Sequence, residues 1–148
     1  MKKETCSRFK KISCIIRKKI DHLDFRQEYP ELTNVMCWTI GFIYRNSVKN
    51  EVYQKDIENE FKINKSTATE LLQTMSELGY ITREVSDYDG RLKRIFLTEK
   101  ALNVHKEIQN GIKNIEEQAT KGLSSDDIKI LYQYLDQIEA NLMKEGND

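Results

Sequence analysis

The sequence has a single proline and only six glycines, so it contains little material for long flexible linkers. None of its apolar runs approaches the roughly 20 residues that a membrane-spanning helix needs. The first eleven residues, MKKETCSRFKK, lack the apolar segment of a secretory signal. The three cysteines, Cys6, Cys14 and Cys37, are odd in number and lack the spacing of metal ligands, which indicates reduced thiols. We therefore expect a cytoplasmic protein without a membrane segment, metal or cofactor.

Catalytic motifs are also missing. The sequence has no nucleophile elbow, no glycine-rich phosphate loop and no cluster of metal-spaced ligands, so it does not indicate an enzyme. Hydrophobic residues make up 39% and charged residues 32% of its 148 positions. This composition is enough for one hydrophobic core and favours long amphipathic helices. We expect a single domain over residues 1–148.

The charge is balanced overall but unevenly distributed. The formal net charge is zero, so no overall positive field attracts the protein to nucleic acid. Residues 1–20 hold eight Lys or Arg against Glu4 alone, residues 51–100 hold eight against ten acidic residues, and residues 101–148 hold five against nine. A solvated helix face explains the basic N-terminal run better than a phosphate contact does. Any affinity for phosphate must come from the placement of a few cations.

Two helices are expected before residue 50. The first has an apolar face at helical spacing and ends before Pro30, because the residue preceding a proline is disfavoured in the α region. Thr33 is a suitable N-cap for the second, which runs to about Asn46. Its apolar residues cover nearly the whole circumference, so we expect it to be central and buried. A short strand is possible at residues 52–53. The apolar face of the first helix comprises Phe9, Ile12, Ile16, Ile20 and Leu23.

The middle of the chain predicts a helix-turn-helix followed by a hairpin. Residues 54–61 form a short helix, residues 62–64 a turn, and Asn64 caps a fourth helix that ends at Gly79. Residues 81–86 and 92–97 are rich in β-branched and aromatic residues and predict two strands, with turn chemistry in the DYDG sequence between them. The apolar face of the fourth helix comprises Ala68, Leu71, Leu72, Met75 and Leu78.

Two long helices are expected after Thr98, separated at Gly122, with Ser124 or Ser125 beginning the second. Each carries apolar residues at alternating spacings of three and four, which predicts a helix–helix seam. We expect these helices, in residues 99–145, and the first helix, in residues 1–28, to form a dimer interface. His105 lies in the first seam, where a register-setting interface residue is a better explanation than a metal ligand. The two seams are Ala101, His105, Ile108, Ile112, Ile115 and Ala119, then Ile128, Leu131, Leu135, Ile138 and Leu142.

The fold class expected from these elements is mainly α with a small β-hairpin (α+β), with a DNA-binding lobe over residues 33–98. The major groove of B-DNA admits one helix, whose N-terminal side chains reach the base edges. An arginine at a hairpin tip suits the electronegative minor groove, and Asp89 can brace that arginine or an amide of the turn. Gln54 is placed for a phosphate contact. The candidate DNA-binding residues are Gln54, Asn64, Lys65, Ser66, Thr67, Thr69, Glu70, Gln73, Asp89, Arg91, Lys93 and Arg94.

Residues 54–98 resemble the winged helix-turn-helix of the MarR family of bacterial transcriptional regulators. The resemblance is carried by KDIENEF, by NKSTATELLQTMSELGYI and by DGRLKRIFLT, in which Asp89, Arg91, Leu97 and Thr98 stand in the family's wing signature. The flanking helices match the family's dimerisation helices, so the resemblance covers the whole chain. It implies a homodimer that reads a palindromic site in double-stranded DNA, usually a repressor released by a small ligand or by oxidation.

Three questions stay open at this stage. Glu70 stands where the family often has arginine, and together with the neutral charge it leaves room for a winged-helix protein–protein interaction module. Cys14 and Cys37 allow a thiol-based redox-sensing regulator, although buried structural thiols are the better explanation of both. The resemblance also implies a pocket for a small aromatic effector. Its candidate lining residues, which core packing also explains, are Tyr29, Trp38, Phe42 and Tyr44.

Overall fold

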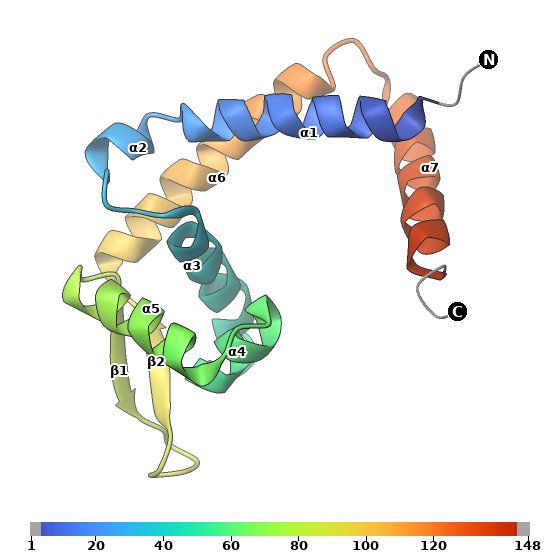
Figure 1. Ribbon diagram of the computed structural model, residues 1–148. Coiled ribbons are helices and arrows are strands. Elements are labelled where there is room, and N and C mark those ends of the chain that lie inside the picture. The colour runs from blue at the N-terminus through green and yellow to red at the C-terminus, as the bar shows by residue number, and fades with distance from the viewer. Residues whose placement is uncertain (1–3, 145–148) are drawn as a thin grey trace. The chain divides into compact units, whose positions relative to one another are not determined.

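The computed structural model describes residues 4–144, which contain seven helices and one two-stranded antiparallel hairpin (Figure 1). This confirms the mainly helical class with a small hairpin. The chain divides into two units, Met1–Gly111 and Ile112–Asp148. Residues 1–3 and residue 145, which belong to the expected dimerisation segments, lie outside the described residues. Within residues 4–144, no helix is long and apolar enough to cross a membrane.

The N-terminal segment forms two helices, α1 (Thr5–Asp21) and α2 (Phe25–Glu28), so the expectation of one continuous helix was wrong. The amide of His22 donates to the Lys19 carbonyl at 3.3 Å, and the amide of Leu23 donates to the Ile20 carbonyl at 3.2 Å. Such bonds across three residues tighten and end a helix. The chain then turns, and Phe25 becomes buried in the core.

Helix α3 (Asn34–Ser47) begins where expected, since the Thr33 hydroxyl accepts a 3.3 Å hydrogen bond from the Met36 amide. Ile40 and Ile43 are fully buried. The expectation that this helix is central and buried holds for these residues but is wrong for Trp38, which is 63% exposed. Apolar residues on nearly all sides of a helix therefore need not all be buried by the rest of the same chain. The surface at Trp38 is available to a ligand or a second molecule.

Helices α4 (Gln54–Phe61) and α5 (Lys65–Glu77) confirm the predicted helix pair. The turn between them places Lys62 in the left-handed conformation at φ 51°. Asn64 caps α5, as its side-chain oxygen accepts a 2.8 Å hydrogen bond from the Thr67 amide. Just after α5, Gly79 has φ 80°, a conformation that glycine adopts without the steric cost of a Cβ atom.

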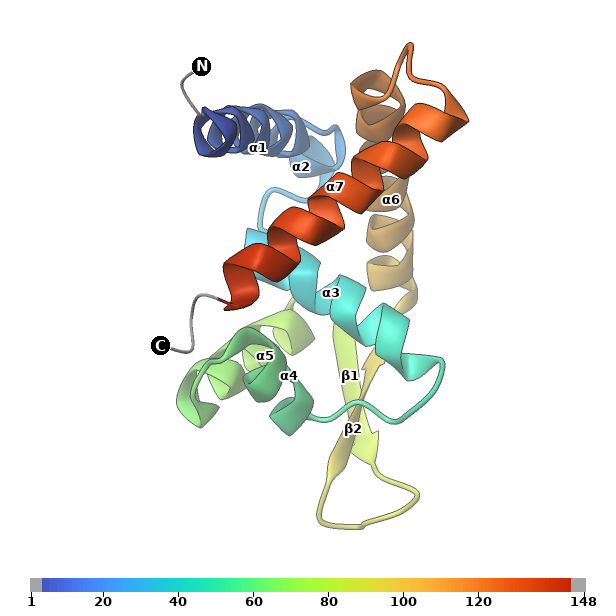
Figure 2. The same ribbon diagram turned by 90° about the vertical axis from the view of Figure 1, so that its right-hand side faces the viewer.

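Strands β1 (Ile81–Val85) and β2 (Lys93–Leu97) form the predicted hairpin, each one residue shorter than expected at the loop end. Ile81 pairs with Leu97, and Val85 pairs with Lys93. The possible strand at residues 52–53 does not form. The carbonyl of Val52 instead accepts one hydrogen bond, at 2.8 Å, from the amide of Ile95 in β2. Figure 2 shows this hairpin extending below α3, with α4 and α5 to one side.

The core of the first unit joins α3, α4, α5, the hairpin and the first half of α6 (Glu99–Ala119). Burial of each large apolar side chain contributes about 1.5–3 kcal/mol relative to exposure, so this cluster holds the helix-turn-helix against the rest of the unit. Members with less than 2% exposure include Ile40, Ile43, Ile57, Leu72, Met75, Tyr80, Ile81, Ile95 and Val104.

The first half of the α6 seam differs from expectation. Ala101, His105 and Ile108 are buried in the chain's own first unit, so these residues are not left for a dimer interface. The ring of His105 lies against that of Tyr44, with centroids 4.2 Å apart. Burial, with a smaller effect of Arg45, lowers the pKa of His105, so its imidazole is neutral at neutral pH.

The second unit comprises the end of α6 and α7 (Ser125–Lys144). Gly122, at φ 87°, lies in the turn that separates the two helices, as predicted. The Ser124 hydroxyl accepts from the Asp127 amide at 3.1 Å, and the Asp127 carboxylate accepts from the Ser124 amide at 2.8 Å. This reciprocal pair is a capping box. Helix α7 has no buried residue among those described.

A cluster around Tyr80 joins three parts of the first unit. The buried Tyr80 hydroxyl donates to the Glu31 carboxylate. Lys100 pairs with the same carboxylate at 3.5 Å, donates to the Leu78 carbonyl at 2.9 Å, and lies 4.3 Å from the centroid of the Tyr80 ring. The Tyr80 hydrogen bond is the largest of the effects that lower the pKa of Glu31. The cluster therefore connects the segment before α3 to the hairpin and α6.

Tyr80→Phe should lower the free energy of unfolding by about 1–2 kcal/mol, because it removes a hydrogen bond to a charged group without changing the ring. Urea denaturation at pH 7 measures the difference. Tyr134→Phe is the matched control, since Tyr134 is 66% exposed, and it should change stability by less than about 0.5 kcal/mol.

The pH dependence of the Tyr80→Phe effect provides a second check. The folded pKa of Glu31 is lowered, so its stabilising contribution is present above the unfolded value near 4.3 and is lost as pH falls through the folded pKa. The two proteins should therefore converge in stability at acid pH. A difference that is constant with pH would contradict the role given to the Glu31 carboxylate.

Candidate nucleic-acid interface

Helix α5 presents a polar surface to solvent along most of its length. A shallow groove of about 620 Å³ lies along it, lined by Lys65, Ser66, Thr69, Glu70, Gln73 and Thr74. Ala68, Leu72 and Met75 bury the opposite side of the helix. The first turn of a helix carries unpaired amides and a partial positive charge. The predicted residues of α5 other than Thr67, which is exposed outside the groove, therefore share one face that combines donors, acceptors and a favourable dipole for phosphate.

Two residues predicted to contact DNA are engaged within the protein. The Gln54 amide group donates to the Thr69 hydroxyl at 2.9 Å and to the Lys65 carbonyl at 3.3 Å. The Thr69 hydroxyl donates its proton to the Lys65 carbonyl at 2.8 Å. These bonds tie the start of α4 to the first turn of α5. Gln54 and Thr69 thus orient the helix pair.

Other members of the predicted set are also partly committed. The Ser66 hydroxyl donates to the Asn64 side chain at 2.9 Å, and the Gln73 amide group donates to the Glu77 carboxylate at 3.0 Å. Among the described residues, the exposed side chains of Lys65, Thr67 and Glu70 make no such bond. Their polar groups face solvent and are the most available for contact with a ligand.

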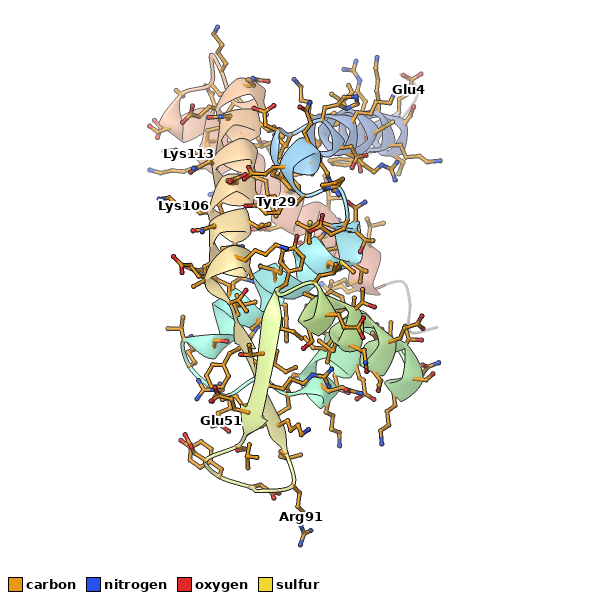
Figure 3. All side chains as sticks on the ribbon, turned by 90° about the vertical axis from the view of Figure 1, so that its left-hand side faces the viewer. Glu4, Tyr29, Glu51, Arg91, Lys106 and Lys113 are labelled. Atoms are coloured by element: carbon orange, nitrogen blue, oxygen red, sulfur yellow. The ribbon has the colours of Figure 1, made fainter. Side chains whose placement is uncertain are left out.

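The tip of the hairpin, or wing, exposes Arg91. Figure 3 shows its side chain at the far end of the hairpin, pointing away from the protein. The Asp89 carboxylate accepts a 3.0 Å hydrogen bond from the Arg91 amide, which is one of the two bracing roles expected for Asp89. The Asp89 carbonyl accepts another from the Leu92 amide at 3.0 Å. Asp89 therefore shapes the turn and leaves the Arg91 guanidinium unobstructed, with the exposed Lys93 following it.

Arg94, also predicted to contact DNA, is directed into the wing. Its guanidinium lies 3.6 Å from the Glu51 carboxylate and 4.4 Å from the centroid of the Phe96 ring, and its side chain is only 26% exposed. The cations that the wing presents to solvent at its tip are therefore Arg91 and Lys93.

The four aromatic residues considered for an effector pocket do not line one cavity. Tyr44 lines a pocket of about 610 Å³ between α3 and α6, together with Arg45, His105 and Lys106. Trp38 lines an apolar groove of about 510 Å³ between α1 and α3. Phe42 packs edge-to-face on Phe61 with centroids 6.1 Å apart, and Tyr29 packs partly buried against the core. The two openings remain separate candidates.

The cysteines are all free thiols. Burial raises the pKa of Cys37, and the nearby Arg26 offsets this only in part. Because the thiolate is the reactive form, this environment disfavours Cys37 as an oxidation sensor. Cys14 is half-buried and Cys6 is exposed. Among the described residues, no three His, Cys, Asp or Glu side chains are grouped to hold a metal ion.

Helices α4 and α5 with the adjoining hairpin constitute a winged helix-turn-helix, a class of DNA-binding fold. A family model described as "MarR family" matches residues 32–92. The transcription regulator MarR from Oenococcus oeni PSU-1 is 31% identical over 91% of this chain and 98% of that chain, with a TM-score of 0.61. The chain belongs to the MarR family of DNA-binding transcription regulators, which are not enzymes.

Two further solved structures share the fold. The S. aureus MepR–DNA complex is 22% identical, covers 90% of this chain and 96% of that chain, and has a TM-score of 0.70. S. aureus MepR bound to ethidium bromide is 23% identical, covers 93% and 95%, and has a TM-score of 0.71. At this level of identity the likeness concerns the arrangement of the elements.

Proposed function

We propose that the protein is a cytoplasmic homodimeric repressor that binds a palindromic operator in double-stranded DNA. Each protomer inserts α5 into a major groove and Arg91 into the flanking minor groove. The two half-sites lie about one helical turn apart, roughly 10 bp centre to centre. The observation that carries the proposal is the exposed polar face of α5 in the same lobe as an unobstructed arginine at the wing tip.

The chemistry of the α5 face fits the edges of base pairs. Lys65 supplies donors that suit guanine acceptors, and Thr67 offers a hydroxyl and a methyl group. Glu70 in its ionised form only accepts hydrogen bonds, and the cytosine amino group is the base-edge donor that a carboxylate reads in the major groove. We therefore assign Glu70 a part in base selection, although it stands where the family often has arginine. Lys93 is placed for a phosphate contact.

Arg91→Ala should weaken binding to the cognate duplex by about 1–3 kcal/mol, because it removes one groove contact. The probe is the duplex that the wild-type protein retains from a pool of genomic fragments, and titration by fluorescence anisotropy gives the dissociation constant. Arg91→Lys keeps the positive charge but lacks the planar guanidinium group, so its affinity should lie between those of Arg91→Ala and the wild type. Lys121→Ala, in the exposed turn after α6, is the control for loss of one positive charge.

Salt dependence separates DNA binding from the protein–protein alternative. A regulator that neutralises phosphates loses affinity steeply as salt rises, because bound counterions are released on binding. The slope of log K against log salt should fall in magnitude by about one for Lys93→Ala, which removes the proposed phosphate contact. Weak binding to every duplex with little salt dependence would favour a winged helix that docks another polypeptide. Unchanged affinity in Arg91→Ala would remove the wing from the mechanism.

The dimer is supported by helices that leave their apolar residues exposed. Neither α1 nor α7 has a buried residue among those described. Ile12 is 51% exposed in α1, and Leu142 is 66% exposed in α7. Exposed apolar surface of this extent marks an interaction site. We assign α1 and α7 to the interface, and the buried seam residues of α6 to the interior of the monomer.

Truncation after residue 119 should give a protein that no longer dimerises, because it removes the seam of α7. Since a truncated chain can also unfold, Leu135→Glu within full-length protein is the second test, and it should shift the species measured by light scattering from dimer to monomer. Gln137→Glu, an exposed position off the seam, is the matched control and should remain dimeric. A dimer that survives both seam changes would contradict the assignment.

We further propose that a small aromatic effector releases the protein from DNA. MepR, which shares the fold, has been solved with ethidium, a planar aromatic cation. The apolar groove at Trp38 has exposed aromatic and aliphatic walls that suit such a ligand. A ligand that favours one arrangement of the two reading helices over another shifts the population between DNA-binding and non-binding dimers.

Trp38 provides a direct reporter, because it is the only tryptophan and lines that groove. Ethidium, added to the protein in the absence of DNA because it also intercalates into duplexes, should quench the Trp38 fluorescence saturably. Trp38→Phe tests for loss of this optical signal, and Trp38→Ala, which removes the aromatic wall of the groove, should reduce the ethidium affinity measured by the fluorescence of ethidium itself. An ethidium affinity that is unchanged in Trp38→Ala would move the site away from this groove, to the pocket at Tyr44.

A further inference from the structure

Glu51, in the segment before α4, is a carboxylate held beneath the wing. Its side chain is only 6% exposed, and Figure 3 shows it beside the hairpin, on the side nearer the loop. A buried charge is costly unless hydrogen bonds and an opposite charge compensate for it. The partners of Glu51 therefore show what the carboxylate does in this place.

The carboxylate is compensated by groups of the wing and of its own segment. One oxygen accepts from the Ser86 hydroxyl at 2.6 Å and from the Tyr53 hydroxyl. The other oxygen is buried without a hydrogen-bond partner and faces the Arg94 guanidinium at the ion-pair distance of 3.6 Å. The Ser86 hydrogen bond, then that of Tyr53, the Asp87 backbone and the charge of Arg94 lower the pKa of Glu51. The group is thus ionised at neutral pH and acts as an acceptor.

Ser86 links the Glu51 carboxylate to the turn of the wing by hydrogen bonds. A hydroxyl has one proton to donate and two lone pairs with which to accept. The proton of Ser86 goes to Glu51, which leaves its oxygen to accept from the amides of Tyr88 at 3.1 Å and Asp89 at 3.3 Å. Asp89 in turn holds the Arg91 amide at 3.0 Å. A continuous series of hydrogen bonds therefore runs from Glu51 to the residue that carries the guanidinium.

The same segment also begins the helix pair. Tyr53 is the N-cap of α4, and its amide donates to the Asp56 carboxylate at 2.8 Å. The next residue, Gln54, is hydrogen-bonded to Thr69 near the start of α5. Residues 51–54 thus contact both parts of the lobe that reach DNA. Their position fixes the wing tip relative to α5.

We infer that Glu51 is a positioning residue for DNA recognition, which holds the turn of the wing through Ser86 so that Arg91 meets the minor groove while α5 occupies the major groove. The inference rests on the proposed function of Arg91. Without the carboxylate, the turn is no longer held in one conformation. It must then lose conformational entropy when DNA binds, which weakens binding. Glu51 acts through the wing and makes no contact with DNA itself.

The first test needs no DNA. Amide hydrogen exchange, read by NMR in wild type, Glu51→Gln and Ser86→Ala, reports on the turn directly. The amides of Tyr88, Asp89 and Arg91 should lose protection in both variants, whereas those of α5 should keep it. Unchanged protection of the turn in Glu51→Gln would overturn the inference, whatever the protein binds.

The second test measures binding to the retained genomic duplex in a double-mutant cycle. Glu51→Gln and Ser86→Ala should each weaken binding about three- to tenfold, the scale of one lost hydrogen bond. In the Arg91→Ala background the same changes should have little further effect, because their action passes through that residue. Losses that add in full to that of Arg91→Ala would indicate a general defect of the fold and overturn the inference.

A matched control distinguishes the effect of the position of Glu51 from the effect of losing one negative charge. Glu84→Gln removes a negative charge from an exposed site on β1 of the same hairpin, and should leave binding to polyanionic DNA equal or slightly tighter. Glu51→Gln removes the same charge but should weaken binding. If Arg91→Ala binds as wild type does, the proposed wing contact is wrong. If Arg91→Ala is weaker and Glu51→Gln is not, the contact stands and the inference fails.

Discussion

The burial of one side of α5 is the constraint on which the candidate DNA-contacting face of this helix depends. Ala68, Leu72 and Met75 are fully buried, and at 3.6 residues per turn this fixes which side chains face outwards. Lys65 and Glu70 are exposed for that reason. The Asn64 cap sets where the helix begins, and thus which amides are at its positive end. The wing and the α4 segment are then positioned relative to a helix that cannot rotate.

Much of this lobe was predictable because its signals are local. Asn64 as a cap, Gly79 after the helix and DYDG between the strands each act through neighbouring residues, and all three predictions are confirmed. The break between α1 and α2 and the exposed Trp38 were not predicted. Both depend on which surfaces the rest of the chain covers, and a helical pattern of apolar residues does not contain that information.

The residues of the candidate site remain a prediction, but the structure shows which of them are exposed and which are already bonded within the protein. Residue type gives the capacity to donate or accept, but it does not show whether that capacity is already used. Gln54 and Thr69 bond to each other, and Arg94 pairs with Glu51. The contacts of Glu51 are not predictable from the sequence, because Ser86 lies 35 residues away and no short-range pattern connects a carboxylate to a serine across that distance.

These internal pairings bear on how a chain of zero net charge can recognise a polyanion. Without a strong positive field, electrostatic steering adds little to the association rate, and non-specific phosphate contacts add little to the affinity. More of the affinity must therefore come from a few well-placed groups. A flexible arginine loses conformational entropy when it is fixed at a groove, whereas one on a turn already held by Glu51 and Ser86 loses less. In the proposed arrangement, Glu51 reduces the local positive charge but favours binding, because it orders the turn before DNA is bound.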